Sequence, residues 1–209
     1  MSALVEAPAP DALDPNGWEC CDEGEIAEGG LPQCPAEFDY ACFKHSQTLH
    51  ADDVFKMTIV EGNNVIVGFA GQNYDPKKDM QTVSSVACVE LGNATAFVGP
   101  NISGDGEEHD HYSLLKDYIP TTKPYDLAMR CDKDGNVPQI QFNDDGMWHD
   151  FASDGRLALK PGPWFPFLTL HDDDRLDNLC VHRPRATKSA GKTLKRKAAA
   201  PVGDSAGAV

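Results

Sequence analysis

Short runs of alternating apolar and polar residues occupy the middle of the chain. Residues 54–60 (VFKMTIV) and 125–131 (YDLAMRC) alternate clearly, whereas residues 164–170 (WFPFLTL) form a nearly continuous apolar run. Because successive side chains of a strand point to opposite faces of a sheet, this period of two predicts β-strands. Further strands are expected at residues 38–45, 65–70, 83–91, 95–98, 137–142 and 179–181, and residues 147–151 lead out of the turn after 137–142.

Turn-forming residues separate these runs at intervals of roughly 8–12 residues. The segment 62–64 (GNN) is expected to close a hairpin between 54–60 and 65–70, and segments 132–135 and 143–146 have the composition of turns. Pro166 cannot donate a hydrogen bond to a sheet, so it predicts a strand end, an edge or a bulge. Roughly ten short strands punctuated in this way predict an all-β, antiparallel sandwich or jelly roll.

The two ends of the chain differ from this pattern. Residues 1–17 are rich in Ala, Pro and Asp and are expected to be a disordered lead-in, and residues 18–36 form an irregular segment that contains Cys and Gly. The predicted sandwich spans residues 37–182. Residues 183–209 contain Ala, Lys, Gly and Ser without an apolar period, so we expect a disordered basic tail.

Charge is divided unevenly between the body and this tail. The net charge of the chain is −15, but the segment from residue 183 onward carries seven basic side chains and one acidic one. Residues 1–182 therefore carry 11 basic and 32 acidic side chains, a net charge of −21. An acidic body favours basic partners or solubility, and it leaves only weak, salt-sensitive nucleic-acid binding through the tail.

Two basic clusters in the tail, separated by a spacer, predict a two-part nuclear import signal: Arg183, Arg185, Lys195, Arg196 and Lys197. The alternatives are a tail that contacts phosphates nonspecifically and a tail that only increases solubility. The sequence has no membrane-spanning apolar run and no signal-peptide pattern at its N-terminus. We therefore expect a soluble, intracellular protein with free thiols, located in the nucleus rather than the cytoplasm.

Three segments, taken in order, resemble the SPRY (B30.2) domain. Residues 55–60 followed by 65–70 resemble that family's paired strands with a Val-Gly-small-apolar ending. Residues 125–151 are similar to its succession of a strand, an Asp-x-x-Gly turn, an Ile-x-Phe strand and an Asn-Asp-Gly-like turn. Residues 162–170 resemble its late segment, in which a Pro precedes the last core strand. The resemblance extends over residues 38–182.

This resemblance implies a bent β-sandwich that binds proteins or peptides through its loops, as a noncatalytic and monomeric module without a cofactor. We expect Trp164, inside an apolar run, to be buried in the core. Trp148 follows a turn, where an exposed tryptophan would be an interface anchor. The predicted partner-binding residues come from three loops: Gln72, Tyr74, Lys78, Asp105, Glu107, Trp148 and His149.

Other residues of the chain are compatible with a different chemistry. His109, His111 and His149 weakly resemble the cupin metal motif, which would make the protein a metal-dependent enzyme. A structural jelly roll that assembles into oligomers is a second alternative. The densest group of candidate zinc ligands is Cys20, Cys21, Cys34, Cys42 and His45. No nucleophile elbow, phosphate-binding loop or dinucleotide motif is present, so the sequence predicts no catalytic residues.

Overall fold

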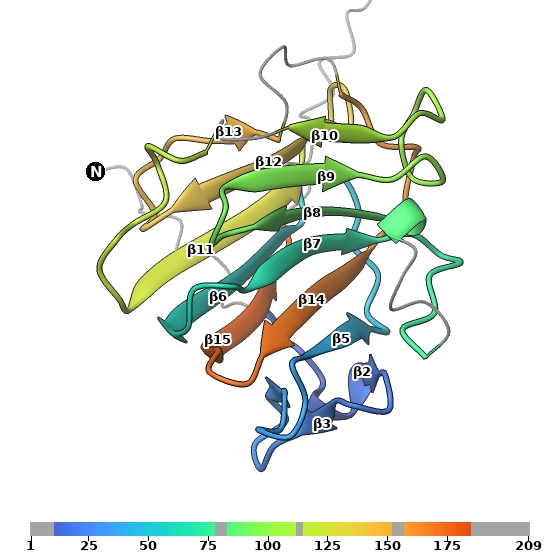
Figure 1. The fold of residues 1–209 in the computed structure, drawn as a ribbon. Coiled ribbons are helices and arrows are strands. Elements are labelled where there is room, and N and C mark those ends of the chain that lie inside the picture. The colour runs from blue at the N-terminus through green and yellow to red at the C-terminus, as the bar shows by residue number, and fades with distance from the viewer. Residues whose placement is uncertain (1–10, 78–82, 112–114, 152–156, 185–209) are drawn as a thin grey trace, which may run out of the picture.

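The chain folds into two antiparallel β-sheets packed face to face (Figure 1). The structure is a computed structural model and describes residues 11–77, 83–111, 115–151 and 157–184. The predicted all-β antiparallel sandwich is confirmed. Lys78 and the tail residues Arg185, Lys195, Arg196 and Lys197 lie outside the described residues.

The first sheet has six strands in the order β1-β15-β6-β11-β12-β13. Their bounds are β1 Asp11–Ala12, β15 Arg175–His182, β6 Val54–Glu61, β11 Tyr125–Cys131, β12 Pro138–Phe142 and β13 His149–Asp150. The expected strand at 125–131 therefore has the predicted bounds. The last strand, β15, begins earlier than the expected 179–181. Its register shifts between Arg175 and Leu176 and between Asp177 and Cys180, and these shifts interrupt the alternation of apolar and polar residues that would reveal the strand in the sequence.

The second sheet has seven strands in the order β10-β9-β8-β7-β14-β5-β2. Their bounds are β10 His109–His111, β9 Thr95–Val98, β8 Val86–Glu90, β7 Ile66–Ala70, β14 Phe165–His171, β5 Tyr40–His45 and β2 Trp18–Cys20. A separate two-stranded sheet pairs β3 (Glu25–Ile26) with β4 (Pro32–Gln33). Pro166 lies at the beginning of β14, just before that strand starts to pair with β5 at Phe167, which confirms the expected strand end.

One core fills the space between the two sheets. Phe55 and Met57 from the six-stranded sheet meet Phe43 and Phe69 from the seven-stranded sheet, and all four side chains are buried. Trp164 is buried in the same core, as predicted, and its indole N–H donates to the carbonyl of Lys160. Burial of a large aromatic side chain with its polar atom satisfied stabilises the sandwich.

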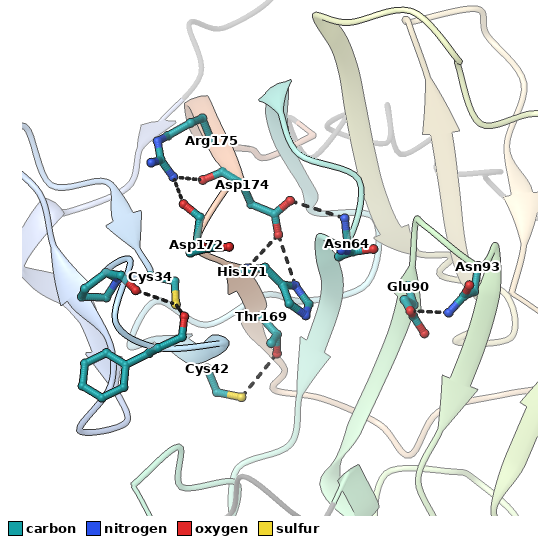
Figure 2. A network of polar contacts seen from close by, with 12 residues as sticks. Cys34, Cys42, Asn64, Glu90, Asn93, Thr169, His171, Asp172, Asp174 and Arg175 are labelled. Atoms are coloured by element: carbon teal, nitrogen blue, oxygen red, sulfur yellow. Dashed lines mark hydrogen bonds and ion pairs between the residues drawn. The ribbon is translucent and has the colours of Figure 1, made fainter.

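The expected hairpin at residues 62–64 is wrong, because β6 and β7 belong to different sheets. Gly62 has a φ of +84°, and a Cβ there would lie 1.9 Å from a carboxylate oxygen of Asp174. The buried Asp174 accepts hydrogen bonds from the backbone N–H groups of His171 and Asn64 (Figure 2). This carboxylate therefore links the β6–β7 crossover to the β14–β15 turn, and burial raises its pKa.

The N-terminal segment forms part of the sandwich, which corrects the expected start at residue 37. β1 pairs with β15 at the edge of one sheet, and β2 pairs with β5 at the edge of the other. We call residues 11–20 the strap, because they span the two sheets. Strands of two and three residues are too short for alternation to reveal them, so sequence reading treats this segment as disordered and irregular.

In the described part of the chain, no helix is long and apolar enough to cross a membrane.

Candidate functional site

The outer face of the seven-stranded sheet is unusually apolar for a surface that is not between the sheets. The register places Gly68 beside Cys88 and Cys88 beside Phe97, with Ile66 and Phe167 on the same face. These side chains belong to a second apolar cluster that is separate from the main core. A Cβ at Gly68 would lie 2.0 Å from the carbonyl oxygen of Ala87, so only glycine fits here.

A groove of about 1130 Å³ opens over part of this face. Its floor includes Ile66, Cys88 and Phe97, and one of its walls is the segment that joins β10 to β11. That segment contributes Lys116, Ile119, Pro120, Thr121 and Lys123. The groove therefore combines an apolar floor with polar and charged edges, as ligand-binding concavities usually do.

Side chains of both charges surround the groove. Glu90 accepts a hydrogen bond from the side-chain amide of Asn93 in the β8–β9 turn (Figure 2). The Lys123 ammonium donates to Asn63, which ties the loop wall to the β6–β7 crossover. Asp110 and Lys116 also line the groove, and no ion pair involves either of them among the described residues. Their charges are therefore available to a bound ligand.

The Cys88 thiol on the groove floor is buried. Burial, with a smaller contribution from Glu90, raises the pKa of the Cys88 thiol to about 12, so this thiol stays protonated and is a poor nucleophile at neutral pH. The lining residues in the described chain include no histidine that could activate the hydroxyl groups of Thr95 and Thr121.

The predicted contact residues Gln72 and Tyr74 lie in the segment that follows β7. The Lys44 ammonium donates to the carbonyl groups of both residues and holds this segment over the sheet. Tyr74 is only 4% exposed and packs edge-to-face on Phe167, with 5.3 Å between ring centroids. Its predicted role as a partner contact is therefore wrong, because it covers the outer face of the sheet, whereas Gln72 is exposed.

Asp105 and Glu107 lie in the loop between β9 and β10 and are both exposed. Hydrogen bonds from the Ser103 hydroxyl, from the Glu107 backbone N–H and from His109 lower the pKa of Asp105 below its ordinary value. The loop neighbours the segment that contains Gln72, since the N–H of Asn101 donates to Ser84 and that of Gly71 donates to Ser85.

Trp148 and His149 are not at this end of the sandwich. The Asp105 loop contacts Leu159 through Ser103, and Leu159 in turn bonds to Asn136, which precedes β12. Trp148 instead comes after the turn that follows β12, at the opposite end of that strand. The structure therefore separates the predicted partner-binding residues into two groups.

Trp148 is half-buried, with the Arg130 guanidinium 4.2 Å from its ring centroid. His149 stacks on Tyr118 at 3.8 Å between centroids, and Tyr118 and Met147 are 48% and 55% exposed. Tyr118 belongs to the same segment that forms the loop wall of the groove, so its ring joins that segment to the β13 edge.

The histidines proposed as a metal motif make other contacts. His109 bonds to Asp105, His149 stacks on Tyr118, and the side chain of His111 is not described. In the zinc candidate group, both ring nitrogens of His45 contact backbone groups, and Cys42 lies on the opposite face of β5, beside Thr169 (Figure 2). Across the described residues, no three His, Cys, Asp or Glu side chains are arranged to hold a metal ion.

Comparison with solved structures shows that the fold is SPRY-like. The SPRY domain of human HERC1 is 10% identical, with a TM-score of 0.51 over 82% of this chain and 96% of that domain. A human SPRY domain is 14% identical, with a TM-score of 0.51 over 79% and 96% of the two chains. The Ca²⁺/Man3GlcNAc-bound exoplasmic/lumenal domain of VIP36 is 9% identical, with a TM-score of 0.47 over 80% and 83%. No family model and no curated protein matches the sequence.

Sequence reading missed the groove altogether. The strands of its floor were expected, but its walls come from segments that are distant in sequence, such as Asn63 and Lys123. No local motif marks these residues. The available signal was the apolar character of both alternating sets in residues 86–89 (VACV), which is typical of a strand that is covered on two faces.

Proposed function

We propose that this protein is a noncatalytic binding module that holds an extended segment of a partner protein in the groove on its seven-stranded sheet. The observation that carries this proposal is the groove itself, with its apolar floor and the charged side chains of Asp110 and Lys116 at its edge. The resemblance to SPRY domains favours a protein partner. The volume of about 1130 Å³ is slightly above the range of drug-sized ligand sites, which favours a chain segment over a small metabolite.

A selection from a displayed library of random peptides tests this function with the full-length protein. We expect enriched peptides that lose affinity at least about tenfold on Phe97→Ala, which removes the aromatic floor, and severalfold on Asp110→Ala. The control is Glu37→Gln, which changes an exposed charge away from the groove. Melting curves of each variant verify folding. Asp110→Ala should stay folded, because it alters only an exposed side chain. Selected peptides that bind both groove variants as well as the wild type would contradict the proposal.

We further propose that the module acts in the nucleus as an adaptor. The support is the pair of basic clusters in the tail. Arg183 is the one residue of these clusters that the structure describes, and its Nε lies 3.9 Å from the Oδ2 of Asp53. A fluorescent fusion should accumulate in nuclei and lose this accumulation when Lys195, Arg196 and Lys197 are all replaced by Ala. Equal distributions of the two fusions would refute the import signal.

A further inference from the structure

The outer face of the six-stranded sheet, opposite the groove, carries a separate group of polar and aromatic side chains. The register places Lys56 beside Ala128 and Arg130 beside Gln139 on this face. The guanidinium of Arg130 covers the ring of Trp148 and donates a hydrogen bond to the Gln139 side-chain oxygen at 2.9 Å. The side-chain amide of Gln139 in turn donates to Asp150 at 2.7 Å. We call this the Trp148 face.

The turn that presents Trp148 is held in place by its own hydrogen bonds. The buried Gln141 side chain, with its oxygen toward the turn, accepts from the N–H groups of Gly146 and Met147 at 2.9 and 3.2 Å. The Asp145 carboxylate accepts from the N–H of Met147 at 2.8 Å. A tryptophan fixed in this way loses little conformational freedom when a partner binds, which favours its use as an interface anchor.

A pocket of about 330 Å³ lies on the same face, and Asp144, from the turn that precedes Trp148, lines it. Ala128, which is buried, forms part of its floor, and Lys56, Asp126, Asp144 and His182 stand around it. The pocket has room for one long side chain of a partner.

The charge of the Trp148 face determines which side chain fits. The Lys56 ammonium pairs with Asp144 at 2.6 Å, whereas Asp126 accepts a hydrogen bond from the neutral hydroxyl of Thr58 and Asp150 accepts one from the neutral amide of Gln139. No cation pairs with either carboxylate among the described residues, and the exposed Asp177 adds a third such charge. The face thus carries four carboxylates, those of Asp126, Asp144, Asp150 and Asp177, against the two cations Lys56 and Arg130, and this excess of negative charge attracts cations.

We propose that the Trp148 face is a second binding surface and that its occupant is a Lys- and Arg-rich segment of another protein. One basic side chain of that segment enters the pocket between Asp126 and Asp144, and the next residues pack against Trp148 and Met147. Because this face and the groove are on the outer sides of different sheets, the module can bridge two partners.

Tryptophan fluorescence of the full-length protein provides a direct test. Trp18 and Trp164 are 8% and 3% exposed, so changes on titration report mainly on Trp148. The probe is a short tryptophan-free peptide in which Lys and Arg alternate with Ala and Leu, and the matched peptide carries Glu in place of Lys and Arg. We expect a saturable change with the basic peptide, no change with the acidic one, and weaker binding at higher salt.

The double variant Asp126→Asn/Asp150→Asn should weaken binding of the basic peptide at least about tenfold, and Trp148→Phe should abolish the signal. The control Glu28→Gln/Glu37→Gln removes the same number of exposed charges elsewhere and should leave affinity within about twofold. Equal losses in both double variants would mean unspecific attraction to an acidic protein and would overturn the proposal, as would tighter binding of the acidic peptide or no binding at all.

The basic tail of the chain itself is a different occupant that the same assay detects. In that case, replacing Arg185, Lys188, Lys192, Lys195, Arg196 and Lys197 together by Gln would change Trp148 fluorescence without added peptide and would increase the affinity for the basic peptide. That result would overturn the proposal of an external partner. Unchanged fluorescence and affinity would support it.

Discussion

Two tryptophans of this chain show how residues with the same chemistry acquire different roles. Trp164 lies between the sheets with its indole N–H bonded to Lys160, and Trp148 lies half-buried beneath the Arg130 guanidinium. The local sequence separates the two cases, since Trp164 begins an apolar run and Trp148 follows a polar turn. The partner of Trp148, by contrast, comes from β11 and was not apparent from the sequence.

Glycine at position 68 is required by the close approach of two strands on the groove floor. The variant Gly68→Ala places a Cβ against the Ala87 carbonyl oxygen, and we expect it to lower the free energy of unfolding by about 1–3 kcal/mol or more. Gly135→Ala is the matched control, because its Cβ would meet nothing closer than 3.4 Å and its φ is not positive. Urea unfolding of both variants measures the difference, and equal stabilities would contradict the clash.

At the scale of elements, the strap is the feature that sequence reading misjudged most. His45 on β5 holds it: the Nε2–H donates to the carbonyl of Asp14 at 2.9 Å, and Nδ1 accepts from the N–H of Gln47 at 3.0 Å. The ring also packs edge-to-face on Trp18 at 4.8 Å. Both ring nitrogens are therefore committed to the neutral form of the imidazole.

The strap should weaken at mildly acidic pH. Burial lowers the pKa of His45 below its ordinary value of about 6.5, so the unfolded chain binds this proton first as the pH falls. The contribution to stability is complete above about pH 6.5 and is lost as the pH falls from there through the lower folded-state pKa. The protection factors of the amides in residues 11–20, which correct for the slower intrinsic exchange at lower pH, should fall over this window before those of the core amides.

A variant isolates the role of this histidine. His45→Ala removes two hydrogen bonds and a buried ring, so we expect a loss of about 2–3 kcal/mol at neutral pH and a flatter dependence of stability on pH. The control His50→Gln alters an exposed histidine and should keep the wild-type pH profile. A wild-type profile in His45→Ala would show that another group titrates.

For the whole molecule, the sandwich places two dissimilar surfaces on its two outer sides. The groove has an apolar floor with charges of both signs, and the Trp148 face has an excess of carboxylates around a small pocket. The strands between them share one core, so neither surface needs the other in order to form.

Binding at the two surfaces should therefore be independent. A peptide selected for the groove and the basic peptide of the Trp148 face are expected to bind together, each with its affinity changed less than about threefold by saturation with the other. Calorimetric titrations in both orders measure this coupling. Mutual exclusion would mean that both peptides occupy one surface.

The sequence alone determined the fold class and most strands of this protein, because alternation with period two is a local property of the chain. It predicted the bounds of β9 and β11, the core position of Trp164 and the resemblance to SPRY domains. These features depend on neighbours within a few residues, and the sequence carries that information directly.

Only the tertiary structure decided which strands pair and which side chains meet. In the structure, β6 and β7 lie in different sheets, the strap pairs with both sheets, Tyr74 is buried, and Trp148 lies apart from the Asp105 loop. The groove and the Trp148 face both join segments that lie far apart in sequence, such as Asn63 with Lys123 and Arg130 with Trp148. Such contacts follow from the packing of whole sheets, and no local pattern of hydrophobic and polar residues encodes them.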